Sequence, residues 1–310
     1  MNKKIFIYAL LILSIMSCRE VHNPYITEEA EMTSPRYFDF STYTEEFKKT
    51  RMSDNSTAKY PKSGQGKLAY EDNFPLNGDY DFNDVVISYK IKETLKHGLV
   101  KSVNATFVSI ATGANYKNGF AVSFKDIINN IESISVQRNK LQDFKSHDVF
   151  GEDIIVNIFP DLHLTFGLYG FINTQDGTSV VEGDTAIFKM TLKKPINLKL
   201  PPYDAFIFRT TNPSLEIHMA DFEPTVRFDK NYFNTGDDES NVFKNKTFRN
   251  KYNLPWAINT HHRWNHPKEN IPINDAYPNF RKWVISGGRK KQNWFMNNKV
   301  DSLIWNNNNK

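Results

Sequence analysis

Apolar and polar side chains alternate along several stretches of this chain, and this period of two constrains the fold more than any other feature. The alternation is clear at residues 85–92 and 185–192. It places every second side chain on one face of a β-strand, so each stretch predicts a strand with one face in a core. Turn dipeptides at residues 77–78, 97–98 and 176–177 separate further runs of strand length, at residues 99–110, 153–159 and 205–210.

Strands and helices do not alternate regularly, which argues against a parallel sheet with crossover helices. Two antiparallel sheets packed face to face bury half-apolar strands best. The sequence therefore predicts a mainly β fold, an antiparallel β-sandwich of jelly-roll-like type, followed by a loop-rich C-terminal segment that contains the tryptophans. Short helices are expected at residues 44–48, 125–132 and 274–286, the last with Asn274 as N-cap and Gly287 directly after its end.

The first eighteen residues have the organisation of a lipoprotein signal peptide. Lys3 and Lys4 precede an apolar run at residues 5–16 that is too short to span a bilayer, and Cys18 follows a small residue, Ser17. Cys18 is the only cysteine, so it has no disulfide partner within the chain and is predicted to receive the lipid. Because two acyl chains already anchor a protein stably, a lipidated Cys18 predicts attachment to the outer membrane or cell surface.

This signal divides the chain into four expected parts. Residues 1–17 are the signal peptide, and residues 18–66 are polar enough to form a lipidated flexible tether. Residues 67–297 form the β domain, in which a subregion at about residues 244–297 is rich in tryptophan and basic residues. Residues 298–310 are rich in asparagine and are expected to be a frayed tail.

Oxygen-bearing side chains crowd the turn before the first alternating strand. Calcium takes six to eight oxygen ligands, and four aspartates within thirteen residues would repel one another without a cation. The predicted calcium ligands are Asp72, Asp79, Asp81, Asn83 and Asp84, with Glu71, Asp237 and Asp238 as further contributors.

An EF-hand is excluded at this turn, because Asp84 and Lys90 stand where that loop has glycine and glutamate. A second interpretation stays open beside the calcium site. Asp79, Asp81 and Asn83 could be turn residues whose side chains bind local backbone, with Asp84 capping the strand.

Positive charge and tryptophan are concentrated at the C-terminal end. From residue 244 onward there are 13 Lys and Arg against three acidic residues, a net charge of +10, and since the whole chain carries +4 the remainder carries −6. All five tryptophans lie in the same part. Trp256 and Trp283 are predicted to anchor it by packing, whereas Trp264, Trp294 and Trp305 suit either packing or an exposed binding surface.

Aromatic and cationic side chains together could bind an acidic envelope glycan or a surface protein. The candidate binding residues are Trp264, Trp294, Arg289, Lys290 and Lys291. His261, His262 and His266 lie nearby, but Pro267 argues against the helix that would turn two of them toward a zinc ion. They are predicted to be surface loop histidines.

Catalytic signatures are sparse. The chain has no nucleophile elbow, no phosphate-binding glycine loop and no HExxH zinc motif. A pair of carboxylates for glycoside hydrolysis stays open, because two acids far apart in sequence can meet in a cleft. The residues favour a protein that is not an enzyme, and an exported protein is not expected to bind nucleic acid.

The same residues carry a family resemblance. The stretch YEDNFPLNGDYDFNDVVISYK at residues 70–90 is similar to the opening motif of the LruC domain (DUF4842 type) of bacterial surface lipoproteins. Later blocks of that family are matched in order by NYKNGF at 115–120, EIHMADFEPT at 216–225, TGDD at 235–238, LPWAI at 254–258 and AYPNFRKWVISGG at 276–288. The resemblance implies a β domain displayed on the cell envelope, and it implies no particular reaction.

The resulting expectation is a non-enzymatic, lipid-anchored cell-envelope protein whose calcium-stabilised β domain binds or scaffolds a partner. Its Asn-, Lys- and Ile-rich composition is typical of Bacteroidota. One alternative is a glycan-binding or glycan-cleaving surface lipoprotein, favoured if Trp264 and Trp294 line a cleft with opposed carboxylates. The other is a structural subunit of a surface assembly, favoured if those tryptophans are buried and a strand edge is uncovered.

Overall fold

The computed structural model describes residues 40–52 and 56–306. The predicted signal peptide, Cys18 and residues 18–39 of the predicted tether lie outside the described residues. One set of strands comprises β1 (Thr57–Tyr60), β2 (Gly66–Tyr70), β3 (Val85–Lys96), β4 (Leu99–Ala111), β6 (Ile131–Arg138), β9 (Thr185–Ile196) and β12 (Ala257–His261). A second set comprises β5 (Asn118–Phe124), β7 (His147–Phe150), β8 (Asp153–Phe159), β10 (Asp204–Arg209) and β11 (Asn212–Ile217).

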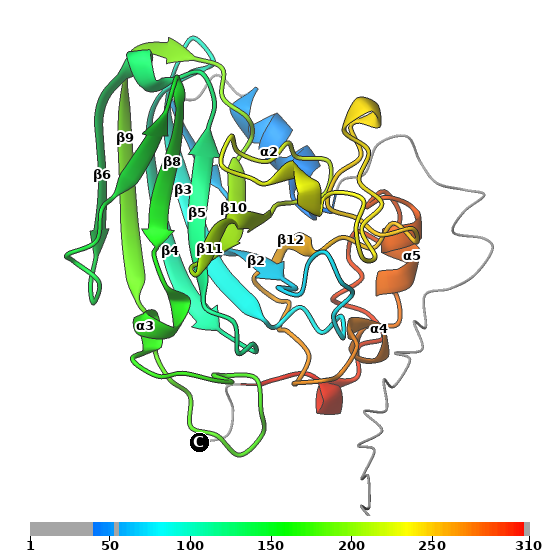
Figure 1. Ribbon diagram of the computed structural model, residues 1–310. Coiled ribbons are helices and arrows are strands. Elements are labelled where there is room, and N and C mark those ends of the chain that lie inside the picture. Colours follow the sequence, from blue (N-terminus) through cyan, green and yellow to red (C-terminus); the bar gives the residue numbers. More distant parts are fainter. Residues whose placement is uncertain (1–39, 53–55, 307–310) are drawn as a thin grey trace, which may run out of the picture.

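These strands form two antiparallel sheets, which confirms the predicted β-sandwich (Figure 1). The seven-stranded sheet has the order β12-β2-β3-β4-β9-β6, with β1 also paired to β3, and the five-stranded sheet has the order β11-β10-β5-β8-β7. The two sheets share one core, in which Phe107 of β4 and Phe120 of β5 meet edge to face with ring centroids 5.4 Å apart. Burial alternates along β9 and the second half of β3, as the period of two predicts.

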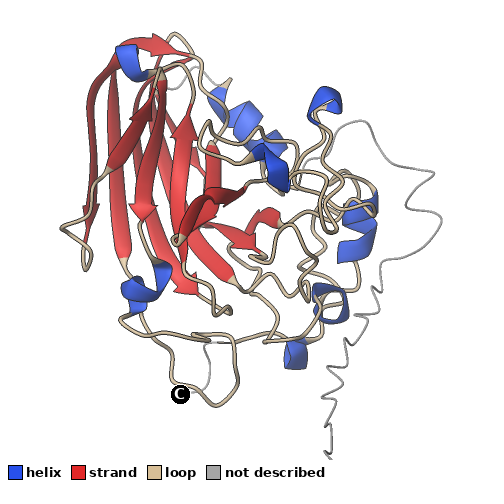
Figure 2. Ribbon diagram, in the orientation of Figure 1, coloured by secondary structure: helices blue, strands red, loops and turns tan. Residues whose placement is uncertain are grey.

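The helices are short. They are α2 (Thr44–Arg51), α3 (Leu162–Phe166), α4 (Ile273–Ala276) and α5 (Phe280–Ile285), with the 3-10 turns η1 (Ile128–Asn130), η2 (Lys230–Tyr232), η3 (Val242–Lys244) and η4 (Asp301–Leu303). The strands gather on one side of the molecule, and the loop-rich part with α4 and α5 lies on the other (Figure 2). Within the described ranges, no helix is long and apolar enough to cross a membrane.

Two of the predicted helices differ from expectation. The expected helix at 125–132 is only the single turn η1, because β6 begins at Ile131 and pairs with β9. The expected helix at 274–286 is divided into α4 and α5 around Pro278, whose ring disfavours helical backbone at the preceding residue, Tyr277 (φ −134°, ψ 80°). Gly287 follows Ser286, the C-cap of α5, and has φ 61°, as its predicted role at the helix end requires.

Residues 40–52 and 56–66, which were predicted to be part of a flexible tether, belong to the fold. Phe40, Tyr43 and Phe47 are buried in the core, and β1 adds to the first sheet through β3. Arg51 at the end of α2 forms a buried ion pair with Glu93 of β3, with N–O distances of 2.5 and 3.2 Å. α2 confirms the helix expected at residues 44–48, but the polar composition around Phe40, Tyr43 and Phe47 hid that this part of the chain packs into the core.

The predicted frayed tail is also packed as far as residue 306. Ile304 and Trp305 are buried, and Trp305 N donates a hydrogen bond to His266 O at 3.0 Å. The end of the loop-rich C-terminal segment (residues 254–306) is therefore packed against an earlier part of the same segment.

Candidate metal centre

The acidic loop (residues 71–84) connects β2 to β3. The last pair of the β2–β3 ladder, Tyr70 with Val85, places the two ends of the loop, Glu71 and Asp84, beside each other at the end of the two strands. Inside the loop, Tyr80 and Phe82 separate residues 79, 81 and 83 and have φ values of 58° and 53°. Positive φ is costly for aromatic residues, so burial of both rings in the core holds the loop in this conformation.

Three carboxylates of the acidic loop converge. Glu71, Asp79 and Asp81 each offer an oxygen that lies within 4.8 Å of the other two. Glu71 and Asp81 are fully buried. The chain at Gly78 approaches Glu71 closely, because a Cβ at residue 78 would lie 2.0 Å from Glu71 Oε2 and would displace that carboxylate. The spacing suits oxygen ligands of one calcium ion, whose metal–oxygen distances are about 2.3–2.6 Å.

Backbone N–H groups orient these carboxylates. Glu71 accepts hydrogen bonds from Phe82 N at 2.6 Å and from Tyr80 N at 3.3 Å. Asp81 accepts one from the N–H two residues later and one from Asn270 N, both at 3.0 Å. Because each carboxylate oxygen has two lone pairs, these bonds fix the carboxylates and leave acceptor capacity for a cation.

Burial and mutual repulsion raise the pKa of the carboxyl groups in the acidic loop. The pKa of Glu71 lies well above its usual value, chiefly because of burial and then because of the charge on Asp79. The pKa of Asp81 is raised by burial and then by Glu71. Burial raises the pKa of Asp72 to about 6. A bound divalent cation would offset this repulsion, so the donor set fits calcium.

The structure divides the predicted ligands into two groups. Asp79 and Asp81 lie with Glu71, whereas Asp84 Oδ2 accepts a hydrogen bond from Asp72 N at 2.8 Å. Asp72 Oδ2 in turn accepts one from the Asn118 side chain at 2.5 Å. Asp84 therefore binds backbone near the start of β3, as the alternative interpretation has it, and Asp72 binds the Asn118 side chain. The charge of Asp72 raises the pKa of Glu71, and the charge of Asp84 raises that of Asp81.

Asp237 and Asp238 are not among the three carboxylates that converge, Glu71, Asp79 and Asp81. Asp237 Oδ2 accepts a hydrogen bond from Asn77 N at 2.8 Å. Asp238 accepts hydrogen bonds from Asn234 N at 2.9 Å and from the Ser240 hydroxyl at 2.8 Å. Their oxygens hold turns rather than facing the convergent carboxylates.

Asn83 and Glu269 lie next to the convergent carboxylates. Asn83 is fully buried, as a ligand of a buried ion would be. Glu269 was not predicted, and burial followed by the charge on Asp79 raises its pKa to about 7. No local pattern could have identified Glu269, because it lies in a loop of the C-terminal segment.

The predicted binding surface of the C-terminal segment does not form. Trp264 and Trp294 are fully buried, and the Trp294 ring lies 5.5 Å from that of Trp283 and 5.2 Å from that of Tyr277. The basic residues 289–291 are exposed. The two tryptophans are thus packing residues, although their polar neighbours in sequence suggested exposure.

The loop histidines also differ from expectation. His266 is buried, with Nε2 2.7 Å from Asn173 O and its ring stacked 5.1 Å from that of Trp305. His261 and His262 lie ring to ring at 3.9 Å, and burial lowers the pKa of His261 to about 4. His266 is therefore a core residue rather than a surface one.

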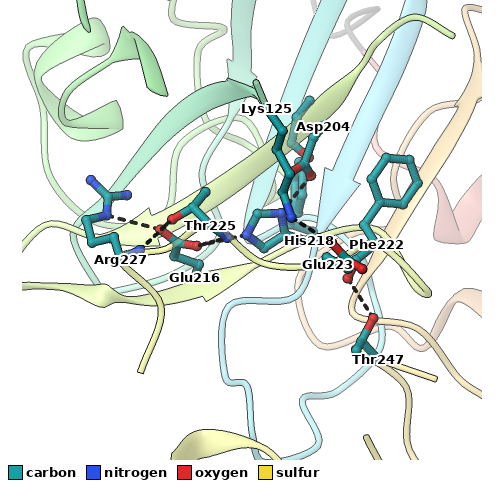
Figure 3. Close-up of polar contacts among 11 residues, drawn as sticks. Lys125, Asp204, Glu216, His218, Phe222, Glu223, Thr225, Arg227 and Thr247 are labelled. Carbon is teal, nitrogen blue, oxygen red and sulfur yellow. Dashed lines mark hydrogen bonds and ion pairs between the residues drawn. The ribbon is translucent and has the colours of Figure 1, made fainter. Parts of the chain in front are cut away.

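A second polar cluster, which sequence reasoning missed, surrounds His218 directly after β11 and includes Asp204 of β10 and Glu216 of β11 (Figure 3). His218 Nδ1 lies 2.7 Å from Asp204 Oδ1, and Nε2 lies 3.0 Å from Glu216 Oε2. Glu216 also accepts hydrogen bonds from the Thr225 hydroxyl at 2.7 Å and from Arg227 Nε at 3.0 Å. All three groups of the Asp204–His218–Glu216 row are buried.

Despite its likeness to a catalytic relay, this row has no free base. Both ring nitrogens of His218 face carboxylates, so neither can accept a proton from a nucleophile. The two carboxylates outweigh burial and raise the pKa of His218 to about 9. The row is a buried ion network that holds the outer face of the five-stranded sheet.

Comparison with known proteins gives a family and a fold. The crystal structure of a "Putative lipoprotein" from Bacteroides ovatus has a similar fold, with a TM-score of 0.60 and 20% sequence identity over 80% of this chain and 75% of that chain. No curated protein matches the chain. A family model described as a domain of unknown function, DUF4842, matches residues 98–295, which begin after the acidic loop and make up more than half of the chain. This match confirms the resemblance seen in the sequence: the chain belongs to the DUF4842 family.

Proposed function

We propose that this protein is a non-catalytic envelope lipoprotein, anchored through Cys18, whose β-sandwich carries a structural calcium site in the acidic loop. The convergence of Glu71, Asp79 and Asp81 within 4.8 Å is the observation that supports the metal site. Calcium would bind these carboxylates as oxygen ligands and offset their repulsion. The residues of the loop would then hold the ion rather than take part in a reaction.

Anchoring is supported by the sequence. Cys18 follows a basic start and a short apolar run, which is the arrangement of a lipoprotein signal peptide. A lipid attached at Cys18 would hold the sandwich at the outer membrane or the cell surface. The described fold includes Phe40, Tyr43 and Phe47, which lie within the range that the sequence predicts as a tether.

The calcium site can be tested on the chain that starts at residue 18 and carries Cys18→Ser. Isothermal titration of metal-free protein should show calcium binding, and calcium at 100 times its Kd should stabilise the fold by about 2.7 kcal/mol. Glu71→Gln should lose this response. Glu239→Gln, which removes the same charge at an exposed position, should keep it. If metal-free wild-type protein shows neither heat of binding nor a changed melting temperature with calcium, the metal site is refuted.

The anchor is tested separately, on the full chain in a bacterial host. Wild-type protein should incorporate a labelled fatty acid and partition into detergent, and Cys18→Ser should do neither. Label that persists in the Cys18→Ser protein would contradict anchoring at this residue.

A structural subunit of a surface assembly is the second candidate function. The tryptophans that would have formed a glycan platform are buried, and in the described part of the chain the edge strand β6 is paired only with β9. An unpaired strand edge can accept a strand from another protein. Replacing Ser133, which lies in this edge strand, with Pro should abolish such an assembly without unfolding the sandwich, as read by crosslinking at the cell surface.

A further inference from the structure

Two buried oxygen atoms beside the acidic loop face the same space without a donor. Neither Asn83 Oδ1 nor Glu269 Oε2 has a hydrogen-bond partner among the described residues, and both atoms are buried. A Cβ placed on Gly113 would lie 1.7 Å from Asn83 Oδ1 and 3.0 Å from Glu269 Oε2. The two oxygens are therefore no more than about 5 Å apart, which is the reach of two oxygens bound to one calcium ion.

In this structure the Asn83 amide directs Nδ2 toward Pro267 O at 3.5 Å and leaves Oδ1 without a donor. Exchanging Oδ1 and Nδ2 would turn Nδ2 toward the Glu269 carboxylate instead, and the calcium affinity of the Glu269→Gln variant distinguishes that amide hydrogen bond from a shared cation. A buried acceptor without a partner costs about 1–3 kcal/mol, and two that face each other also repel. A cation between them would satisfy both.

The same place is continuous with the convergent carboxylates. Asp81 Oδ2 accepts a hydrogen bond from Asn270 N at 3.0 Å, directly after Glu269 in the chain. Ile273 N donates to Tyr80 O at 2.7 Å. Residues 269–273 thus run along the acidic loop, and Glu269 lies in the electrostatic field of Asp79 and Asp81.

We propose that Asn83 and Glu269 are further ligands of the cation centre, so that calcium clasps the C-terminal segment to the acidic loop. This inference rests on the proposed calcium site and adds to it a consequence for the rest of the fold. The ion would join residues 79–83 to residue 269, two parts of the chain that are remote in sequence. Docking of the C-terminal segment then depends on calcium.

The five tryptophans make this dependence measurable in the full mature chain. All of them lie in the C-terminal segment, at residues 256, 264, 283, 294 and 305, so their emission reports on that segment alone. Four are fully buried, and the fifth is nearly so. Removing calcium with EGTA should shift the emission to longer wavelength and increase quenching by acrylamide, and added calcium should reverse both changes.

Glu269→Gln is the decisive variant, with Glu239→Gln as the control of equal charge. Glu269→Gln should bind calcium at least about tenfold more weakly, because the ligand set loses a charge, and its tryptophan response should need correspondingly more calcium. Glu239→Gln should match the wild-type protein in both measurements. Far-ultraviolet circular dichroism checks that the sandwich is intact in each variant.

The outcomes separate this inference from the proposed function. If the wild-type protein binds calcium and Glu269→Gln binds it equally well, the ion is held by Glu71, Asp79 and Asp81 alone and the clasp is refuted. If wild-type protein binds no calcium, both proposals fall. Should Glu269→Gln not fold, the wild-type protein still decides, because unchanged acrylamide quenching between calcium and EGTA refutes the clasp.

Discussion

The stability of the metal-free protein should fall as the pH rises through the range in which the acidic loop ionises. Burial, the largest cause, raises the pKa of Asp72 from 3.8 to about 6, and that of Glu71 and Asp81 well above the usual values. A carboxyl group with a raised pKa binds its proton more tightly in the folded state. Its contribution is complete below the unfolded pKa and is lost as the pH rises through the folded pKa.

Asp72 sets the magnitude of this effect. Its shift of roughly two pKa units corresponds to about 3 kcal/mol, of which roughly 2 kcal/mol is lost between pH 4.5 and 6.5. Glu71 and Asp81 shift in the same direction, so the total loss should be larger. Below this window the carboxyl of Glu216, whose pKa is lowered, acts in the opposite direction. Above this pH window, loss of the proton from His218 begins to lower the free energy of unfolding as well.

The assay is urea unfolding of metal-free protein at intervals between pH 4.5 and 6.5. Asp72→Asn should flatten the pH dependence by roughly 2 kcal/mol, whereas Asp143→Asn, at an exposed position, should leave it unchanged. With saturating calcium the dependence should be reversed or absent, because metal binding favours ionised carboxylates. A free energy of unfolding that stays constant or rises with pH in the metal-free wild-type protein would refute the reasoning.

Three further perturbations test the packing described above. Arg51→Met leaves the Glu93 carboxylate buried without its cation and should lower the free energy of unfolding in urea by about 3–5 kcal/mol. Lys48→Met removes an exposed ion pair with Glu45 and should cost less than about 1 kcal/mol. Equal costs would contradict the role of Arg51. The pKa of His218 is raised to about 9, so the free energy of unfolding should fall by up to about 3 kcal/mol as the pH rises from 6.5 through 9. His218→Gln should remove this pH dependence. A free energy of unfolding of the wild-type protein that is constant in that range would contradict the prediction. Trp294→Ala truncates a core side chain and should lower the free energy of unfolding by about 3–5 kcal/mol. A change near zero would indicate that Trp294 is a surface residue.

The strands and their connections could largely be predicted because the signals are local. The run at residues 153–159 forms β8 with the predicted bounds, and β3 begins at Val85 where the alternation begins. His97 and Gly98 connect β3 to β4 with φ values of 53° and 74°, the conformation that a two-residue hairpin turn of type I′ needs. Strand β5 gave no such signal, since all of its residues are buried and period-two alternation is absent.

The candidate site was only half predictable. Asp79 and Asp81 are near neighbours in sequence, so the crowding of charge that brings in a cation is visible there. Glu269 and Asn270 reach the acidic loop from the C-terminal segment, and Asn270 bonds to Asp81 across 189 residues. A contact of that length depends on how the sandwich and the C-terminal segment pack, which no short pattern encodes.

The sequence by itself determined where the strands and turns lie and that a run of acidic residues precedes β3, because side-chain alternation and turn conformation are settled within about ten residues. Only the tertiary structure decided which carboxylates converge and which bind local backbone. It also decided that Trp264 and Trp294 are buried and that α2 is part of the fold. The physical reason is that burial and convergence depend on surfaces brought together from distant parts of the chain, where packing overrides the polarity of sequence neighbours.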